Sequence, residues 1–120
     1  MQILKNKITK AEIQHKELAD GRWGLMSISE QLANIGSEVS RALNWRKKNR
    51  EEYCLKAFNR AMELIDLTIS AQTSLPRINE LTRLRESLLD YFHNDNSFKT
   101  SEPILRKYFD QFAIRLQIQK

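Results

Sequence analysis

The stretch from Ser27 to Arg50 combines a helix start, an apolar stripe and a basic end. Ser27 or Ser29 can accept a hydrogen bond from a first-turn amide, and Glu30 stands three residues after Ser27, which is the spacing of a capping box. Beyond the cap, apolar side chains and one arginine share a helix face: Ile28, Leu32, Ile35, Val39, Ala42, Leu43 and Arg46. The pattern predicts a long amphipathic helix that the rest of the chain must cover.

Two features of this predicted helix are not explained by its apolar face alone: a glycine in its interior and a tryptophan near its end. Gly36 costs roughly 1 kcal/mol relative to alanine in a helix interior, so we interpret it as a place where another helix packs closely, although a merely tolerated glycine would also fit. Trp45 lies four residues after Arg41, and Arg41 lies three after Glu38, so the three line one strip. This strip predicts an indole that covers the bundle edge beside a surface ion pair.

Three further segments repeat the helical spacing of apolar residues, at 51–72, at 76–92 and near the end of the chain. In the first of them the stripe comprises Tyr53, Ala57, Ala61, Leu64, Ile65 and Thr68. Pro76 and Pro103 fall in the opening turns of the other two, where proline is favoured. We therefore predict an all-α protein, a four-helix up-and-down antiparallel bundle formed by residues 23–120.

Residues 1–22 are predicted to add a peripheral N-terminal helical segment, because their apolar residues fit helical spacing only approximately. A glycine-containing break follows this segment. Trp23 stands between two glycines just ahead of the Ser27 cap, and we interpret it as an anchor that tucks under the bundle.

The composition is that of one ordinary globular domain. The 120 residues are 41% hydrophobic and 29% charged, and no apolar run approaches the roughly 20 residues that cross a bilayer. The amino terminus is too polar for a signal peptide, which predicts a cytoplasmic location and no membrane partner. Cys54 is the single cysteine, which excludes an internal disulfide and a cysteine-cluster metal site.

Positive charge is concentrated at the end of the long helix. The chain has 20 Lys and Arg against 15 Asp and Glu, a formal charge of +5, and its densest basic block is 46–50. Cations there complement the helix dipole, and beside a tryptophan they also suit the phosphates and bases of RNA or DNA. If nucleic acid is bound, the predicted contact residues are Arg41, Trp45, Arg46, Lys47, Lys48 and Arg50. A solvated helix end would have the same sequence pattern.

Two pairs of carboxylates have the helical spacing that metal-binding bundles use. Glu63 and Asp66 are three residues apart, and Glu86 and Asp90 are four apart. Such bundles add Glu-x-x-His pairs, which this chain lacks, and nearby arginines favour ion pairs between helices instead. We predict no metal site and no small-molecule cofactor.

Catalytic signatures of familiar enzymes do not occur in the sequence: it has no glycine-rich phosphate loop, no G-x-S-x-G and no HExxH. One partial match is to the HEPN ribonucleases, small helical bundles in which an arginine is closely followed by a histidine on a late helix. Arg85 and His93 enclose seven residues, which is wider than that motif. We therefore predict no catalytic residue, and we regard an enzymatic activity as the less favoured interpretation.

Three stretches of the chain resemble a group of short bacterial helical proteins. They are W-G-L-M-S-I-S-E-Q-L-A-N-I-G-S-E-V from Trp23 to Val39, A-F-N-R-A-M-E-L-I-D-L-T-I from Ala57 to Ile69, and L-T-R-L-R-E-S-L-L-D-Y-F from Leu81 to Phe92. The resemblance spans Trp23 to Phe112 and implies no activity. In architecture alone, the chain is also similar to the four-helix proteins encoded in ribosomal-RNA intervening sequences, to the accessory proteins of diversity-generating retroelements and to the helical partners of minimal nucleotidyltransferases. These similarities imply oligomers that act close to nucleic acids.

A basic helical bundle without catalytic signatures predicts a non-enzymatic accessory or adaptor protein. We expect it to act through protein–protein contacts and self-assembly, as a homo-oligomer or with a protein partner. The alternative is a module of the HEPN-like toxin–antitoxin type that binds or cleaves RNA.

Overall fold

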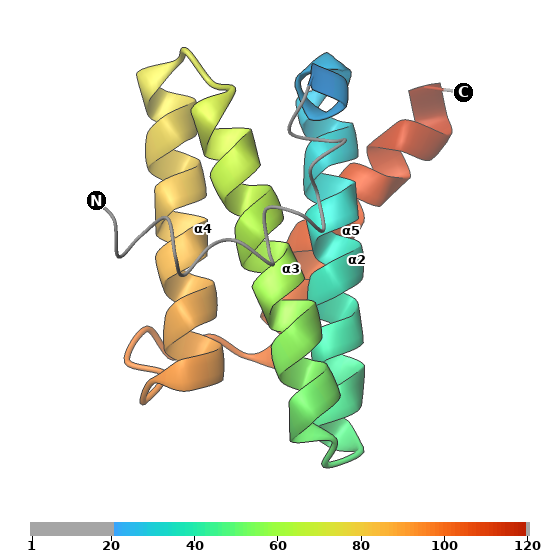
Figure 1. Ribbon diagram of the computed structural model, residues 1–120. Coiled ribbons are helices and arrows are strands. Elements are labelled where there is room, and N and C mark those ends of the chain that lie inside the picture. The colour runs from blue at the N-terminus through green and yellow to red at the C-terminus, as the bar shows by residue number, and fades with distance from the viewer. Residues whose placement is uncertain (1–20, 120) are drawn as a thin grey trace.

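The computed structural model describes residues 21–119, and in that range it consists of four long α-helices and one short 3-10 helix (Figure 1). The elements are η2 (Trp23–Leu25), α2 (Ile28–Lys47), α3 (Glu51–Ser70), α4 (Leu75–His93) and α5 (Glu102–Gln119). Consecutive long helices run antiparallel, which confirms the predicted all-α, up-and-down bundle (Figure 1). The N-terminal segment predicted for residues 1–22 lies, except for its last two residues, outside the described part of the chain.

Helix α2 begins at a capping box. The Oγ atom of Ser27 accepts a hydrogen bond from the Glu30 amide at 3.1 Å, and a carboxylate oxygen of Glu30 accepts one from the Ser27 amide at 3.1 Å. Just ahead of this cap, Trp23 is buried, and its indole Nε1 donates to Oγ1 of Thr68 on α3 at 2.9 Å. The interpretation of Trp23 as an anchor is confirmed, and the capping box fixes where the chain enters the bundle.

The core combines the apolar stripes of all four helices. Helix α2 packs against both α3 and α5, and α4 packs against α3. The core residues without exposed surface are Leu32, Ile35, Ala42, Ala57, Ala61, Ile65, Leu81 and Leu88. The prediction was wrong at Tyr53, which is 45% exposed. Its ring lies against Trp45 at the end of the bundle and does not reach the core.

Helices α2 and α5 meet at Gly36. A Cβ atom on residue 36 would lie 2.7 Å from the Cβ of Phe109 and 2.9 Å from its Cγ. These distances are shorter than the usual contact distance between non-bonded carbon atoms. The absence of a side chain at Gly36 therefore lets α5 approach α2, which confirms the interpretation of this glycine as a close-packing site.

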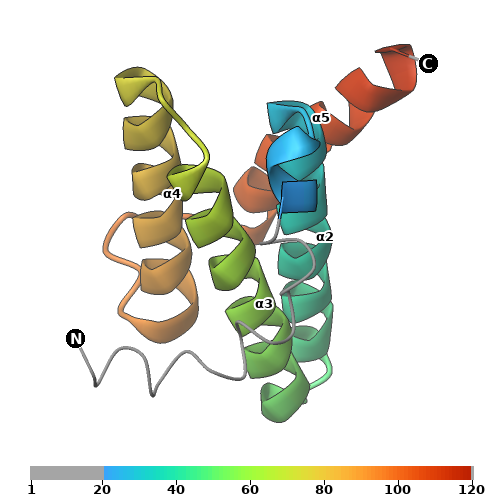
Figure 2. The same ribbon diagram turned by 45° about the horizontal axis from the view of Figure 1, so that its top comes forward.

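Helices α4 and α5 scarcely touch each other, although a closed four-helix bundle would pack them together. The last turns of α5 lead away from α4 in both views of the molecule (Figures 1 and 2). The bundle is therefore open along its α4–α5 edge.

The connection between α4 and α5 is organised by Asp90. Its buried carboxylate accepts hydrogen bonds from the amides of Ser97 at 2.9 Å and Phe98 at 3.0 Å. Asn96 adopts a left-handed conformation with φ of 53°. Its side-chain Nδ2 donates a hydrogen bond to the carbonyl of Thr100, and its Oδ1 accepts one from the Thr100 amide. Asparagine tolerates this conformation better than most residues, so it suits this position in the turn.

Candidate functional site

Five of the six predicted nucleic-acid contact residues lie at the end of the bundle where α2 turns into α3, and the sixth, Arg41, lies farther back along α2. Asn49 has a φ of 58°, and this left-handed residue reverses the chain between the two helices. The amide of Arg50 donates to the carbonyl of Trp45 at 3.0 Å, which closes the turn. The turn exposes Lys48 and Arg50 together.

Arg46 connects α2 to α4. Its Nη1 donates to the carbonyl of Tyr91 at 3.3 Å, and its guanidinium carbon lies 5.1 Å from the Tyr91 ring centroid and 5.5 Å from that of Phe92. Arg46 is thus engaged with two aromatic side chains of the same protein, which favours a structural role for it.

Lys47 connects α2 to α5. Its Nζ atom lies 2.9 Å from Oε2 of Glu102. The other carboxylate oxygen of Glu102, Oε1, pairs with Arg106 at 3.2 Å. The hydrogen bond from Lys47 is the main cause that holds the pKa of Glu102 below its usual value. Arg106 also donates to Ser40 and Asn44 of α2, both at 2.9 Å. Lys47 therefore belongs to a polar network that joins α2 to α5.

Arg41 takes part in a three-residue ionic cluster on the other side of α2. The Glu38 carboxylate accepts hydrogen bonds from Arg41 at 2.8 Å and from Arg60 of α3 at 3.0 Å. The ion pair predicted between Glu38 and Arg41 is confirmed. The contribution of Arg60, which lies far away in sequence, was not predicted.

Trp45 and Tyr53 form an aromatic pair across the α2–α3 turn. Their ring centroids are 4.8 Å apart, with an interplanar angle of 31°. The Nζ atom of Lys48 lies 5.3 Å from the Trp45 ring, and that of Lys56 lies 5.7 Å from the Tyr53 ring. Sequence reasoning missed Tyr53 and Lys56 as site residues. The sequence feature that could have indicated them is the short separation between the two helices. Because α3 begins directly after a tight turn, its first residues lie beside the end of α2.

One carboxylate of each predicted pair is hydrogen-bonded to another part of the protein. Asp66 accepts a hydrogen bond from Nε of Arg85 at 2.7 Å, and Asp90 holds the loop that follows α4. Within residues 21–119, no group of three or more His, Cys, Asp or Glu residues is placed to hold a metal. Burial raises the pKa of the Cys54 thiol, which lowers the fraction of reactive thiolate.

Arg85 and His93 are not brought to one point. Both lie on α4, eight residues apart, which corresponds to about 12 Å along the helix axis. Arg85 faces Asp66 on α3, whereas the His93 ring stands edge-on to Phe58, with centroids 4.6 Å apart. In this conformation the two side chains therefore have separate partners on α3.

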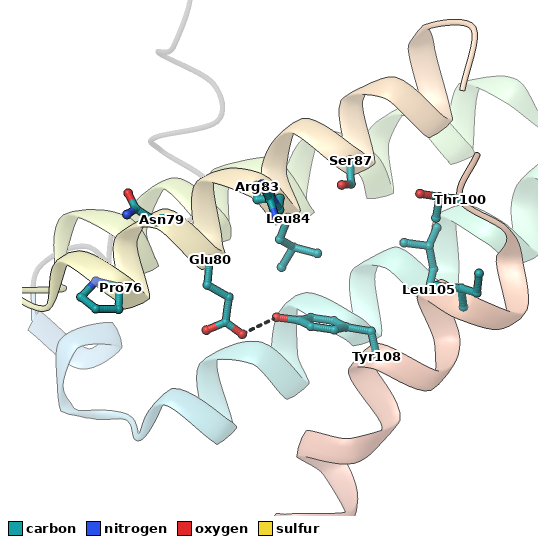
Figure 3. Close-up of a pocket in the computed structure, with 10 residues that line it drawn as sticks. Pro76, Asn79, Glu80, Arg83, Leu84, Ser87, Thr100, Leu105 and Tyr108 are labelled. Atoms are coloured by element: carbon teal, nitrogen blue, oxygen red, sulfur yellow. Dashed lines mark hydrogen bonds between the residues drawn. The ribbon is translucent and has the colours of Figure 1, made fainter. Parts of the chain in front are cut away.

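A hollow lies along the open α4–α5 edge. This groove encloses about 680 Å³ and is shown in Figure 3. Its apolar lining consists of Pro76, Leu84, Ile104 and Leu105. Glu80 and Tyr108 point toward each other across it, and the Tyr108 hydroxyl donates to Glu80 at 3.2 Å. Burial is the main cause that raises the pKa of Tyr108, so the hydroxyl remains a donor.

Comparison of the chain with protein-family models, with curated proteins and with solved structures finds no match. The resemblance to short bacterial helical proteins therefore stays a prediction. None of the helices in residues 21–119 has both the length and the apolar character that spanning a bilayer requires.

Proposed function

We propose that this protein is a non-enzymatic helical accessory protein that acts by self-assembly and by protein–protein contact through the α4–α5 groove. The observation that supports this proposal is that α4 and α5 stand apart, so one of the four helix interfaces expected in a closed bundle is left open.

Several exposed apolar residues lie at the start of α4 and along α5, the two helices that line the groove. Ile104 on its wall is 60% exposed, and Leu75, which immediately precedes the groove residue Pro76, is 66% exposed. Farther along α5, Ile114 is 54% exposed and Ile118 is 78% exposed. Single exposed apolar residues are ordinary on protein surfaces, but a partly apolar groove whose helical wall continues into further exposed apolar residues suits a protein partner.

The occupant that these features favour is helix α5 of a second copy. Residues 100–108 of one chain form a wall of the groove, and α5 then continues as a projecting end that carries Ile114 and Ile118. One surface thus offers both a groove and an apolar helix end. A two-fold dimer requires this kind of self-complementary surface, because each chain gives and receives the same element.

Analytical ultracentrifugation of the full chain at micromolar concentration tests the proposal. We expect a dimer, and we expect Ile104→Asp and Ile118→Asp each to shift the mass toward the monomer. Leu55→Asp is the matched control, because Leu55 is 45% exposed on α3 outside the groove lining. A wild-type chain that remains monomeric, or variants that dimerise as well as the control, would contradict self-assembly through this edge.

A further inference from the structure

Trp45 and Tyr53 lie together on the surface although both are large aromatic residues. Neither belongs to the buried core or to the partly buried residues packed on it. Their rings are 4.8 Å apart and come from two different helices, and Tyr53 keeps 45% of its surface exposed. Core packing therefore does not explain why two aromatic rings are held side by side at this end of the bundle.

Cations surround the aromatic pair. Lys48 lies over Trp45 and Lys56 over Tyr53, and Arg50 is exposed in the turn between the two helices. Lys48 and Arg50 form no ion pair with any residue in 21–119. Lys56 pairs with Glu52 at 3.6 Å, but both side chains are more than half exposed, so the pair is weak.

The acidic residues nearby cancel this charge only in part. Glu51 and Glu52 stand in the first turn of α3, where they also face the positive end of the helix dipole. Lys48, Arg50 and Lys56 therefore leave a local excess of positive charge around the two rings. We call these five residues, Trp45, Lys48, Arg50, Tyr53 and Lys56, the aromatic–cation surface.

A half-buried tryptophan paired with an exposed tyrosine, and exposed cations around them, match the two chemical parts of a single-stranded nucleic acid. Bases that are not paired expose flat faces that stack on aromatic side chains, and the phosphates attract lysine and arginine. In a duplex the base faces are already stacked on each other, so a duplex could contact the cations through its phosphates but could not stack on the aromatic rings. An acidic polypeptide would likewise use only the cations.

We infer that the aromatic–cation surface binds single-stranded nucleic acid, with bases stacked on the Trp45–Tyr53 pair so that both rings contribute, and with phosphates held by Lys48, Arg50 and Lys56. This site goes beyond the self-assembly proposed above and lies on other helices than the α4–α5 groove. A monomeric chain would leave it intact, so the two proposals can fail separately.

Fluorescence anisotropy of the full chain with labelled oligonucleotides tests this inference. The probes are oligo-U, oligo-dT and a DNA duplex of equal length, each at about 50 and about 200 mM salt, with polyglutamate as a competitor. We expect at least one single strand to bind more tightly than the duplex. Its binding constant should fall with salt with a log–log slope of about −2, as three phosphate contacts would give. The relative affinity for oligo-U and oligo-dT then distinguishes RNA from DNA.

Substitutions separate stacking from charge. Trp45→Leu should weaken single-strand binding at least about fivefold, whereas Tyr53→Phe, which retains the ring, should leave it within about twofold. Lys56→Glu should weaken binding more than Lys107→Glu, which makes the same charge change at an exposed position on α5. Circular dichroism of each variant reports whether it folds. If Trp45→Leu does not fold, Tyr53→Leu replaces it with the same expectation.

Four results would overturn the inference. They are no binding of either single strand at low salt, equal affinity for duplex and single strand, full competition by polyglutamate at equal charge concentration, and unchanged affinity in a folded variant that lacks one of the two rings.

Discussion

Gly36 on α2 and Phe109 on α5 lie so close that a Cβ atom on residue 36 would stand 2.7 Å from the Cβ of Phe109. The Cβ of Phe109 is fixed to the α5 backbone, and its ring is buried. A side chain at residue 36 therefore cannot be accommodated by a simple rotation of the phenyl ring, and α5 itself would have to shift.

Gly36→Ala is accordingly expected to destabilise the protein. Alanine gains roughly 1 kcal/mol of helix propensity, but overpacking a well-packed interface typically costs about 1–3 kcal/mol, so the clash should win. Thermal unfolding followed by circular dichroism measures the result. Gly24→Ala is the control, because a Cβ there meets nothing within 4 Å. A Gly36→Ala variant more stable than the wild type would show that α5 moves freely.

Thr68→Val should lower the free energy of unfolding by about 1–3 kcal/mol, because it leaves the buried Trp23 indole without its hydrogen-bond acceptor. Urea unfolding measures this loss. Thr82→Val, an equal change at an exposed position on α4, should cost little. In a double-mutant cycle with Trp23→Phe the two losses should not add, and full additivity would argue against the contact.

Asp90→Ala should cost roughly 2–4 kcal/mol, because the buried carboxylate accepts hydrogen bonds from two loop amides. Hydrogen exchange of the Ser97 and Phe98 amides should accelerate more than exchange in α2. Asp95→Ala changes an exposed carboxylate in the same loop and serves as the control. Unchanged protection of these two amides would contradict the role of Asp90.

Glu102 should titrate at lower pH than an ordinary glutamate, chiefly because Lys47 donates a hydrogen bond to its carboxylate. A group with a lowered folded-state pKa adds stability above its unfolded pKa and loses it as the pH falls through the folded value, so this contribution disappears only in acid. In Lys47→Ala the pKa of Glu102 should rise toward 4.5, and in Lys107→Ala it should stay unchanged. NMR titration of the Glu102 carboxyl carbon measures both, and equal values in the two variants would exclude the Lys47 bond.

Much of the fold is encoded in short-range spacing that can be read without coordinates. The Ser27 capping box needs only residues three apart, and Gly36 and Trp23 stand out as residues that are costly or unusual where they occur. These features depend on local chemistry, which is why the helices, the close packing site and the anchor were predicted correctly.

The partners of long charged side chains depend on tertiary structure instead. Arg46 reaches a carbonyl of Tyr91, and Lys47 reaches Glu102, both far along the chain. A run of basic residues cannot reveal which of them turn toward another helix. Spacing also could not show that Tyr53 lies against Trp45. Tyr53 has the same helical spacing as the core residues that follow it on α3, so the sequence pattern predicts that it is buried with them.

The open α4–α5 edge also predicts how the protein unfolds in parts. Helix α2 is packed between α3 and α5, whereas α4 has α3 as its principal neighbour, supplemented by the Arg46 contact and the Tyr108–Glu80 hydrogen bond. Local opening reactions involve the elements with the fewest packed surfaces first. We therefore expect α4 to detach as a unit before the other three helices separate, and its leucines would then be exposed to proteases while α2, α3 and α5 still form a folded nucleus.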